Sequence, residues 1–417
     1  MGILDLLFRR SPEASSSSRI HANAGAFLSF DDPRLVEYLR SGTATTSGVS
    51  VSVESAMRNP AVFRSLSLIS QTIGMLPLHL LEKNTKEKAR DHPLFRVLHR
   101  KPNDYQSAYD FRVLMQLRAL VKGNAYALIV RGARREVLSL VPLNPDRVTP
   151  IQGSDWRVSY RYEPGGGGHQ TFAPEEILHI RNMPDMGSNG VLGVSLVRQA
   201  ADAIGLALAQ DLAVSRLFKN GSFVPLALST KDKLSDIAIK RLKDSWASGY
   251  AGADNAGKMP ILEEGLSPVA IASTAKDAQT IELRKHQIEE IARVLGVPRP
   301  LLMMDDTSWG SGIGVLGQFF VRYGLNPWFD AWQQAIERSL LTDAEADRFE
   351  VKFNAGVLLR GSMAEQGDFL AKALGAGGHQ PWMHADEARD FMDLPVRDIP
   401  PNTMLGHNGG PPLKDGA

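Results

Sequence analysis

The sequence of 417 residues contains no cysteine. Disulfide bonds, thiol nucleophiles and thiolate metal sites are therefore excluded, and the composition suits a reducing cytosol. The sequence also lacks an excess of either charge, with 47 Lys and Arg against 46 Asp and Glu and a net charge of +1. Overall electrostatics thus favours neither a nucleic-acid coat nor an enzyme for acidic substrates. Any contact with DNA must be local or steric.

A secretory signal is also missing from the start of the chain. Residues 3–8 form an apolar run that is too short to span a bilayer, and Arg9 and Arg10 follow it, the reverse of a secretory signal. We expect a protein that is neither secreted nor membrane-bound. The apolar run predicts one face of a small docking helix, with membrane binding as the alternative.

Motifs that carry chemistry are absent as well. The ten histidines are scattered, and no pair has the i, i+4 spacing that sets two metal ligands on one helix face; His379 and His384 are five apart across Pro381. There is no phosphate loop and no Gly-x-Ser-x-Gly nucleophile elbow. The run Gly165 to Gly168 lies between two predicted strands, which indicates a hairpin loop and not a nucleotide cradle. We therefore expect no catalytic, cofactor-binding or metal residues and no enzyme.

What the sequence does contain is 43% hydrophobic residues, enough for substantial cores. Residues 11–55 are rich in small polar residues, which favours an arm that is mobile or ordered by a partner. Helices are predicted after Asn59-Pro60, after His92-Pro93 and after the cap region 104–107, the last ending at Gly123. From 124 to 180 apolar residues recur with a period of two residues, which predicts strands at 125–130, 137–141, 158–162 and 177–180. This indicates an α+β fold.

Two long helices are predicted next, at 195–219 and 275–295, around a small β-α-β insert. The second is mostly charged and has a narrow apolar stripe of Ile281, Ile288, Ile291 and Leu295. A helix so polar elsewhere is not expected in a single-chain core. Beyond a loop at 303–312, a third long helix should kink at Pro327, which lacks one backbone donor. A strand at 349–353, short helices at 362–374 and 384–392, and a Pro/Gly tail complete the chain.

Several short motifs follow one another in an order that resembles the portal protein family of long-tailed phages, prophages and gene transfer agents. The resemblance covers roughly 55–395. The motifs are Gly2 to Arg10, Gly74-Met-Leu-Pro-Leu78, His92-Pro-Leu94, Lys101-Pro-Asn103, Gly123-Asn-Ala-Tyr126, Glu176-Ile-Leu-His-Ile-Arg181, Gly190 to Ser195, Asn220-Gly221, Glu290-Ile-Ala-Arg293, Gly296-Val-Pro298 and Leu325-Asn-Pro327.

The resemblance implies a portal-type subunit with an α/β wing, long stem helices, a small β-α-β clip and a helical crown, assembling as a ring, usually of twelve copies. The regions it implies are an N-terminal arm (1–54), a wing (55–194), a stem helix (195–222), a clip (223–274), a second stem helix (275–297), a tunnel loop (298–315), a long kinked helix (316–348), a wing strand with crown helices (349–395) and a tail (396–417).

It further implies a virion protein of the unique capsid vertex, assembled in the bacterial cytoplasm. Its expected partners are other copies of the chain, double-stranded DNA passing without sequence specificity, the terminase large subunit, a head-tail adaptor and the major capsid protein. Other structural connectors and a hydrolase or nuclease are the alternatives; adaptors are usually much shorter.

Two sets of candidate site residues come from the same resemblance. Residues after the tunnel loop, Ser311 to Gln318, depart from the asparagine, apolar residue and glutamate that family members often carry there. Trp309 either touches DNA or anchors the loop on a neighbouring subunit. The candidates are Asp305, Asp306, Thr307, Ser308, Trp309 and Ser311 for the DNA-facing loop, and Lys240, Lys243, Trp246 and Tyr250 for the clip interface.

Overall fold

Helix α4 (Pro60–Met75) begins where the sequence predicts, because the Asn59 side chain accepts hydrogen bonds from the amides of Ala61 and Val62. Such a cap contributes about 1 kcal/mol. The computed structural model describes residues 42–165, 167–220, 226–229, 235–237, 239–241, 244, 267–270, 274–304, 312–359, 363–378 and 380–392.

Two more helices follow α4 along the chain. His92 caps α5 (Pro93–His99), and its Nδ1 accepts from the amide of Leu94. Helix α6 (Ala108–Lys122) begins at a capping box between Ser107 and Asp110 and ends at Gly123, whose φ of 80° is left-handed. Helices α4 and α6 pack closely: a Cβ on Gly74 would lie 2.4 Å from Val113 Cγ2. Any larger residue would push the two helices apart.

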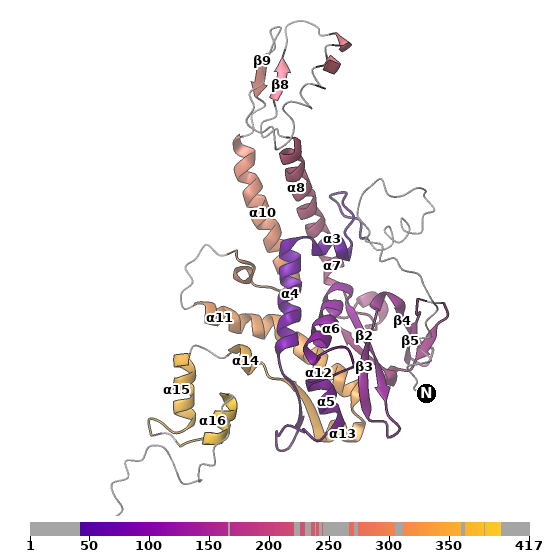
Figure 1. Ribbon diagram of the computed structural model, residues 1–417, viewed down its shortest axis with the longest axis vertical. Coiled ribbons are helices and arrows are strands. Elements are labelled where there is room, and N and C mark those ends of the chain that lie inside the picture. The colour runs from indigo at the N-terminus through magenta and orange to yellow at the C-terminus, as the bar shows by residue number, and fades with distance from the viewer. Residues whose placement is uncertain are drawn as a thin grey trace, which may run out of the picture.

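Two antiparallel three-stranded sheets lie beside α6: one packs against α6, and the other packs against the first sheet (Figure 1). Their orders are β3-β2-β7 and β4-β5-β6, and β5 and β6 are joined through Gly165 to Gly168 as predicted. Strand β4, which was not among the predicted strands, contains Pro150; β4 is an edge strand, where a missing donor is tolerated. The strands are β2 (Asn124–Arg131), β3 (Val137–Leu143), β4 (Val148–Gln152), β5 (Val158–Tyr162), β6 (Gln170–Phe172) and β7 (Ile177–Arg181).

A pair of helices projects from this body and carries a two-stranded sheet at its far end (Figure 1). Helices α7 (Leu196–Gln199) and α8 (Ala201–Asn220) lead outward, and α10 (Thr274–Leu295) returns. Strands β8 (Leu226–Ser229) and β9 (Ser267–Ala270) pair antiparallel. Residues 236–237, 239–241 and 244, between them in the sequence, are helical.

The chain then passes through η5 (Arg299–Leu302) to α11 (Gly312–Phe319) and α12 (Asn326–Leu340). The predicted break near Pro327 is a π-helical stretch, η6 (Phe320–Leu325), in which the amide of Asn326 donates to the carbonyl of Val321, five residues back. A π turn is a recognised way to fit a local disruption into a helix. Phe319, the last residue of α11, is 56% exposed.

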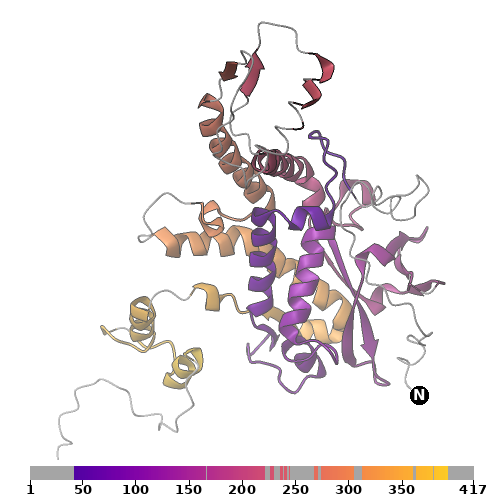
Figure 2. The ribbon, with the colours of Figure 1, turned by 45° about the horizontal axis from the view of Figure 1, so that its top comes forward.

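After α13 (Asp343–Arg348), strand β10 (Phe349–Phe353) pairs antiparallel with β1 (Leu78–Glu82), far away in the sequence. This pairing returns the chain to α4 and closes the main core around Trp332, which is 1% exposed and donates from its Nε1 to Gln116 Oε1 at 2.7 Å. The short helices α14 (Gly356–Leu359), α15 (Met363–Ala373) and α16 (Ala385–Phe391) follow, on the side opposite β4 and β5 (Figure 2). The α+β fold class is confirmed.

The last part of the predicted N-terminal arm, residues 42–54, packs against the body; residues 1–41 lie outside the described residues. Within 42–54, Thr43 and Val51 bridge through two backbone hydrogen bonds, and Val51 is 2% exposed. Helix α3 (Val53–Met57) follows at once. The small polar residues that looked like a linker form a turn instead: Thr45 Oγ1 donates to the Val49 carbonyl at 2.6 Å, and the Thr46 amide donates to Asp202 on α8 at 2.9 Å.

Candidate functional site

The projecting helices are joined to the body by a small apolar base and to each other by an ion pair. At the base, Ile204 of α8 and Ile291 of α10 are fully buried. Farther out, Arg284 Nη2 lies 2.8 Å from Asp211 Oδ1, and Leu212 and Leu283 are about half exposed. The outer part of the pair therefore keeps polar and apolar faces that the described chain does not cover.

Helix α10 ends in a tight cap that redirects the chain. Gly296 has φ 70°, and the amide of Val297 donates to the Ala292 carbonyl at 3.0 Å, a Schellman arrangement. Pro298 and η5 follow, and Arg299 pairs with Glu289 at 2.8 Å. The motif Gly296-Val-Pro298 thus sets the direction in which the chain enters residues 305–311.

Three other motif segments meet in one buried junction. A Cβ on Gly123 would lie 2.1 Å from the Gly193 carbonyl oxygen, so both glycines are needed for this backbone contact. The Asn124 side chain accepts from the Gly193 amide at 2.9 Å and donates to the Gly193 carbonyl at 3.3 Å. Ser195 Oγ donates to the Val121 carbonyl at 2.5 Å. The end of α6 is thereby fixed to the start of α7, which leads into α8.

His179 on β7 continues the same junction. Its Nε2 lies 3.0 Å from Asn124 Oδ1, and its Nδ1 lies 3.1 Å from Tyr160 Oη. Because Asn124 Oδ1 is an acceptor, Nε2 carries the proton and Nδ1 accepts from the tyrosine. Burial, together with Arg181 and Arg338, holds the pKa of His179 well below its ordinary value. The imidazole is neutral. Its hydrogen bonds join β7 to β2 in one sheet and to β5 in the other sheet.

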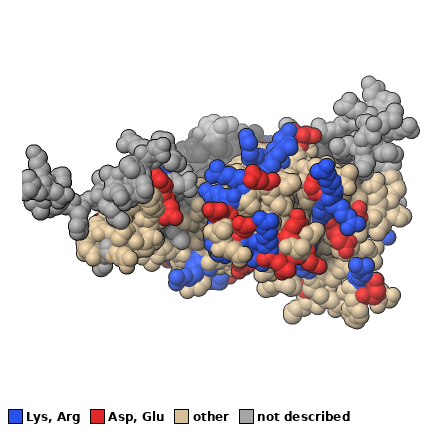
Figure 3. Space-filling model, turned by 90° about the horizontal axis from the view of Figure 1, so that it is seen from below, with Lys and Arg blue, Asp and Glu red and all other residues tan. Residues whose placement is uncertain are grey.

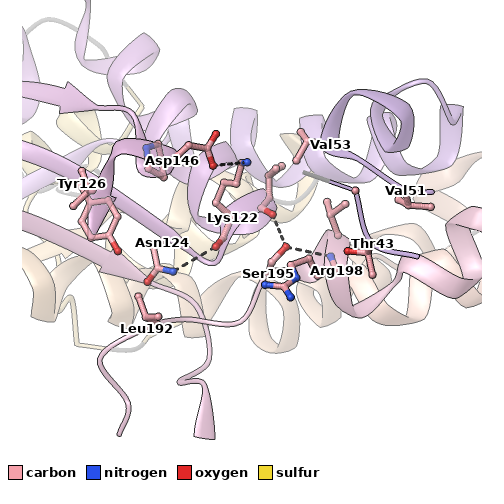
Figure 4. A pocket seen from close by; sticks show the side chains of 15 residues that line it. Thr43, Val51, Val53, Lys122, Asn124, Tyr126, Asp146, Leu192, Ser195 and Arg198 are labelled. Atoms are coloured by element: carbon pink, nitrogen blue, oxygen red, sulfur yellow. Dashed lines mark hydrogen bonds and ion pairs between the residues drawn. The ribbon is translucent and has the colours of Figure 1, made fainter. Parts of the chain in front are cut away.

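A cavity of about 610 Å³ lies beside this junction and is a candidate for a catalytic site (Figure 4). Its wall includes Ser195, but this hydroxyl already donates to Val121 and accepts from the Arg198 amide at 3.1 Å. Lys122 is paired with Asp146 at 2.6 Å. A serine used as a helix cap and a lysine in an ion pair do not form a nucleophile and its base. The arrangement stabilises the fold.

Most of the predicted site residues lie outside the part of the chain that the structure describes. Asp305, Asp306, Thr307, Ser308, Trp309 and Ser311 lie outside the described residues, as do Lys243, Trp246 and Tyr250. Lys240 is helical and exposed, beyond the end of α8. The sequence also gave no reason to single out Asn124 and His179 as partners, because the contact joins residues 55 positions apart.

The described residues hold no group of three or more His, Asp or Glu side chains placed to bind a metal ion. Among the same residues, no helix combines the length and hydropathy needed to cross a bilayer.

Comparison with known proteins extends this picture. The family model for phage portal proteins matches residues 60–393. The portal protein of Enterobacteria phage HK97 is 32% identical over 377 residues, covering 87% of each chain. The probable portal protein of Streptomyces phage phiC31 is 30% identical over 372 residues, covering 85% of this chain and 78% of that one.

Solved structures show the same fold. A chain from the neck of an empty gene transfer agent particle superposes with a TM-score of 0.59 at 24% identity, covering 87% of this chain and 99% of the other. An HK97-family phage portal protein from Corynebacterium diphtheriae gives a TM-score of 0.54 at 18% identity, over 74% and 97% of the two chains. With a family match over most of its length and relatives of this identity and coverage, the chain belongs to the phage portal protein family.

Proposed function

We propose that this chain forms a ring of twelve copies at the unique vertex of a phage or gene transfer agent capsid, through which DNA is packaged and ejected. The observation that carries the proposal is the projecting pair α8 and α10, with a small sheet at its end, on a body that matches the portal family. A ring closes when each copy presents two different, complementary faces to its neighbours.

In this ring the two helices (195–222 and 275–297) are the stem. Helix α10 has 22 residues, so at about 1.5 Å per residue it spans roughly 33 Å of the channel. Its charged outer faces would lie against neighbouring copies and a wet channel, which accounts for their lack of intrachain cover. The region 223–274 is the clip, and its exposed Lys240, with Lys243, Trp246 and Tyr250, forms the surface that meets the packaging ATPase and the head-tail adaptor.

The loop 298–315 is proposed to face DNA. It leaves the cap at Gly296 and enters α11, which lies on the side of the body opposite β4 and β5 (Figures 1 and 2). If α11 points toward the ring axis, the sheet β4-β5-β6 points outward, toward the major capsid protein. Asp305, Asp306, Thr307, Ser308, Trp309 and Ser311 then border the channel, and two carboxylates in such a loop limit persistent phosphate contacts.

The chain is proposed to be passive in the chemistry of packaging. Portal proteins are structural, and a separate terminase large subunit would supply the ATP hydrolysis that moves DNA. The subunit would be made and assembled in the bacterial cytoplasm and remain in the virion at the portal vertex. In this setting DNA slides as a polyanion without sequence readout, which agrees with a net charge of +1.

Electron microscopy of the purified chain, with class averaging and a solution mass, tests the proposal. Rings of about twelve copies with a central hole are expected. A stable monomer would move the test to purified particles, where the chain should occupy one vertex. Its absence from that vertex would overturn the proposed function.

A further inference from the structure

A cavity of about 580 Å³ lies between β7, the loop that follows β7, and α12. Arg181, the last residue of β7, and Arg338, near the end of α12, both line it. The cavity borders the junction around Gly123 through His179, and it lies outside the regions assigned to the stem, clip and tunnel loop. No role in the proposed channel uses it.

The two arginines bring positive charge to this cavity without an acidic partner. Arg181 Nη1 donates to the Gly190 carbonyl, and Arg338 Nη2 donates to the His179 carbonyl at 3.3 Å. Asp330 also lines the wall, yet within the described part of the chain it forms no ion pair with either guanidinium. Main-chain carbonyls orient the arginines without neutralising them, and the single carboxylate of Asp330 leaves the wall with a net positive charge, so the cavity favours an anion.

The positive charge of the two arginines also acts on the buried imidazole of His179, which lines the cavity. Both arginines contribute to keeping the pKa of His179 low, and Arg181 also lowers the pKa of Arg338, after burial. The repulsion between the two guanidinium groups costs free energy. A carboxylate that lies between them removes this cost.

The rim of the cavity is apolar and indicates a protein ligand. Met183 is 68% exposed at the rim, and Trp328 forms part of the wall. Met186, on the same loop, is 98% exposed. Arginine, methionine and tryptophan are the residues enriched where proteins meet, whereas a site for a DNA backbone is more open and more uniformly basic. The anion is therefore expected on a folded surface.

We propose that this pocket receives an Asp or Glu side chain from a second copy of the chain, as a fixed ionic contact between neighbours. The inference rests on the proposed ring, because a ring presses one face of each copy against a different face of the next. Charge complementarity selects the acidic side chain, and the fork geometry of two guanidinium groups gives the contact a defined direction.

The test places a competing carboxylate at the rim. Met183→Glu is compared with Leu138→Glu, a matched control on β3 whose side chain is 54% exposed outside the cavity. Each variant is produced with the other head proteins, and purified particles are assayed for the chain. We expect Met183→Glu to lower incorporation at least tenfold, and Leu138→Glu to stay within twofold of wild type. Equal incorporation of both variants would overturn the inference and leave the proposed function intact.

A second readout identifies the neighbour. A photo-crosslinking residue replaces Met183 in assembled particles, and the products are identified by mass spectrometry. A product of two copies of this chain supports the inference. A product with a different protein overturns it without affecting the proposed function, whereas particles that lack the wild-type chain overturn both.

Arg338→Gln, which removes the charge at a partly exposed side chain, should reduce incorporation as well, and Arg338→Lys should recover part of it.

Discussion

At the scale of residues, several arginines of the body bind main-chain carbonyls. Arg112 is the most buried case: its Nε and Nη2 donate to the Gly74 carbonyl at 3.1 and 2.7 Å, and its Nη1 donates to the Leu98 carbonyl at 3.0 Å. These carbonyls belong to the last turns of α4 and α5, where the helix dipole is negative. Burial lowers the pKa of Arg112 to about 10, so the guanidinium is still charged at neutral pH.

Replacing Arg112 with methionine should destabilise the protein. The change keeps most of the side-chain volume but leaves two carbonyls in the core without their donors, which we expect to cost about 2–4 kcal/mol. Urea unfolding followed by tryptophan fluorescence measures this. Arg134→Met, on the exposed turn between β2 and β3, is the matched control and should shift stability by less than about 0.5 kcal/mol. Similar losses in both variants would contradict the carbonyl-binding role.

Three histidines with lowered pKa should make stability depend on pH. Burial first, and then nearby Lys88 and His99, lower the pKa of His79 to about 4, and the pKa of His99 and of His179 is lowered too. In the unfolded chain these groups protonate near pH 6.5. Their contribution is therefore complete above pH 6.5 and is lost as pH falls from 6.5 toward 4.

Denaturation midpoints at a series of pH values check this expectation. The slope between pH 6.5 and 4 should flatten in His79→Gln, whereas the exposed His169→Gln should leave it unchanged. Stability that stays flat in the wild type over this range would show that the histidines do not govern it.

At the scale of elements, close backbone contacts decide how the helices and sheets join. A Cβ on Gly193 would lie 2.2 Å from the Gly123 carbonyl oxygen, and neither backbone can move without breaking the hydrogen bonds to Asn124. Gly193→Ala should therefore lower stability by about 3 kcal/mol or more.

Gly367 on α15 provides the opposite case. A Cβ there meets nothing within 4 Å, so Gly367→Ala should raise local helix stability by about 0.5–1 kcal/mol. Hydrogen exchange of the amides around each position distinguishes the two effects. A Gly193→Ala protein as stable as wild type would show that α6 and α7 need no such close approach.

Local signals explain why many elements could be predicted from sequence. Asn59, Ser107 and Gly123 cap helices through contacts with residues close by in the sequence. The predicted helix ends coincide with these caps. Strand β10 was predicted at its observed bounds because Phe349, Val351 and Phe353 alternate inward. In contrast, the Gly123–Gly193 contact and the carbonyl partners of Arg112 depend on distant segments. All the candidate site residues on the tunnel loop and on the clip remain predictions.

At the scale of the whole molecule, the end opposite β8 and β9 mixes both charges (Figure 3). Lys86 pairs with Glu350 at 3.0 Å, and Arg348 pairs with Glu82 at 2.7 Å. Because opposite charges alternate there, this end of the described molecule presents no single-sign field that would hold DNA. The proposed role requires passage of DNA and little retention.

The purified protein should accordingly bind free double-stranded DNA weakly. At physiological salt we expect no micromolar binding and a shallow dependence on salt concentration, because few phosphate contacts release counterions. Fluorescence anisotropy with a short labelled duplex measures both. With Mg²⁺ or Mn²⁺ present, the duplex should also remain intact. Tight binding with a steep salt slope, or cleavage abolished by a single carboxylate substitution, would argue against the portal role.

The antiparallel pairing of β8 with β9 has an evolutionary consequence. Because the chain leaves the body on α8 and returns on α10, both attachment points of the intervening segment are neighbours. Such a segment can be lengthened, shortened or exchanged between related viruses while the body keeps its register. If this segment meets the packaging motor and the tail as proposed, a lineage could acquire a new motor or tail by recombination at two adjacent sites, with little change to the rest of the subunit.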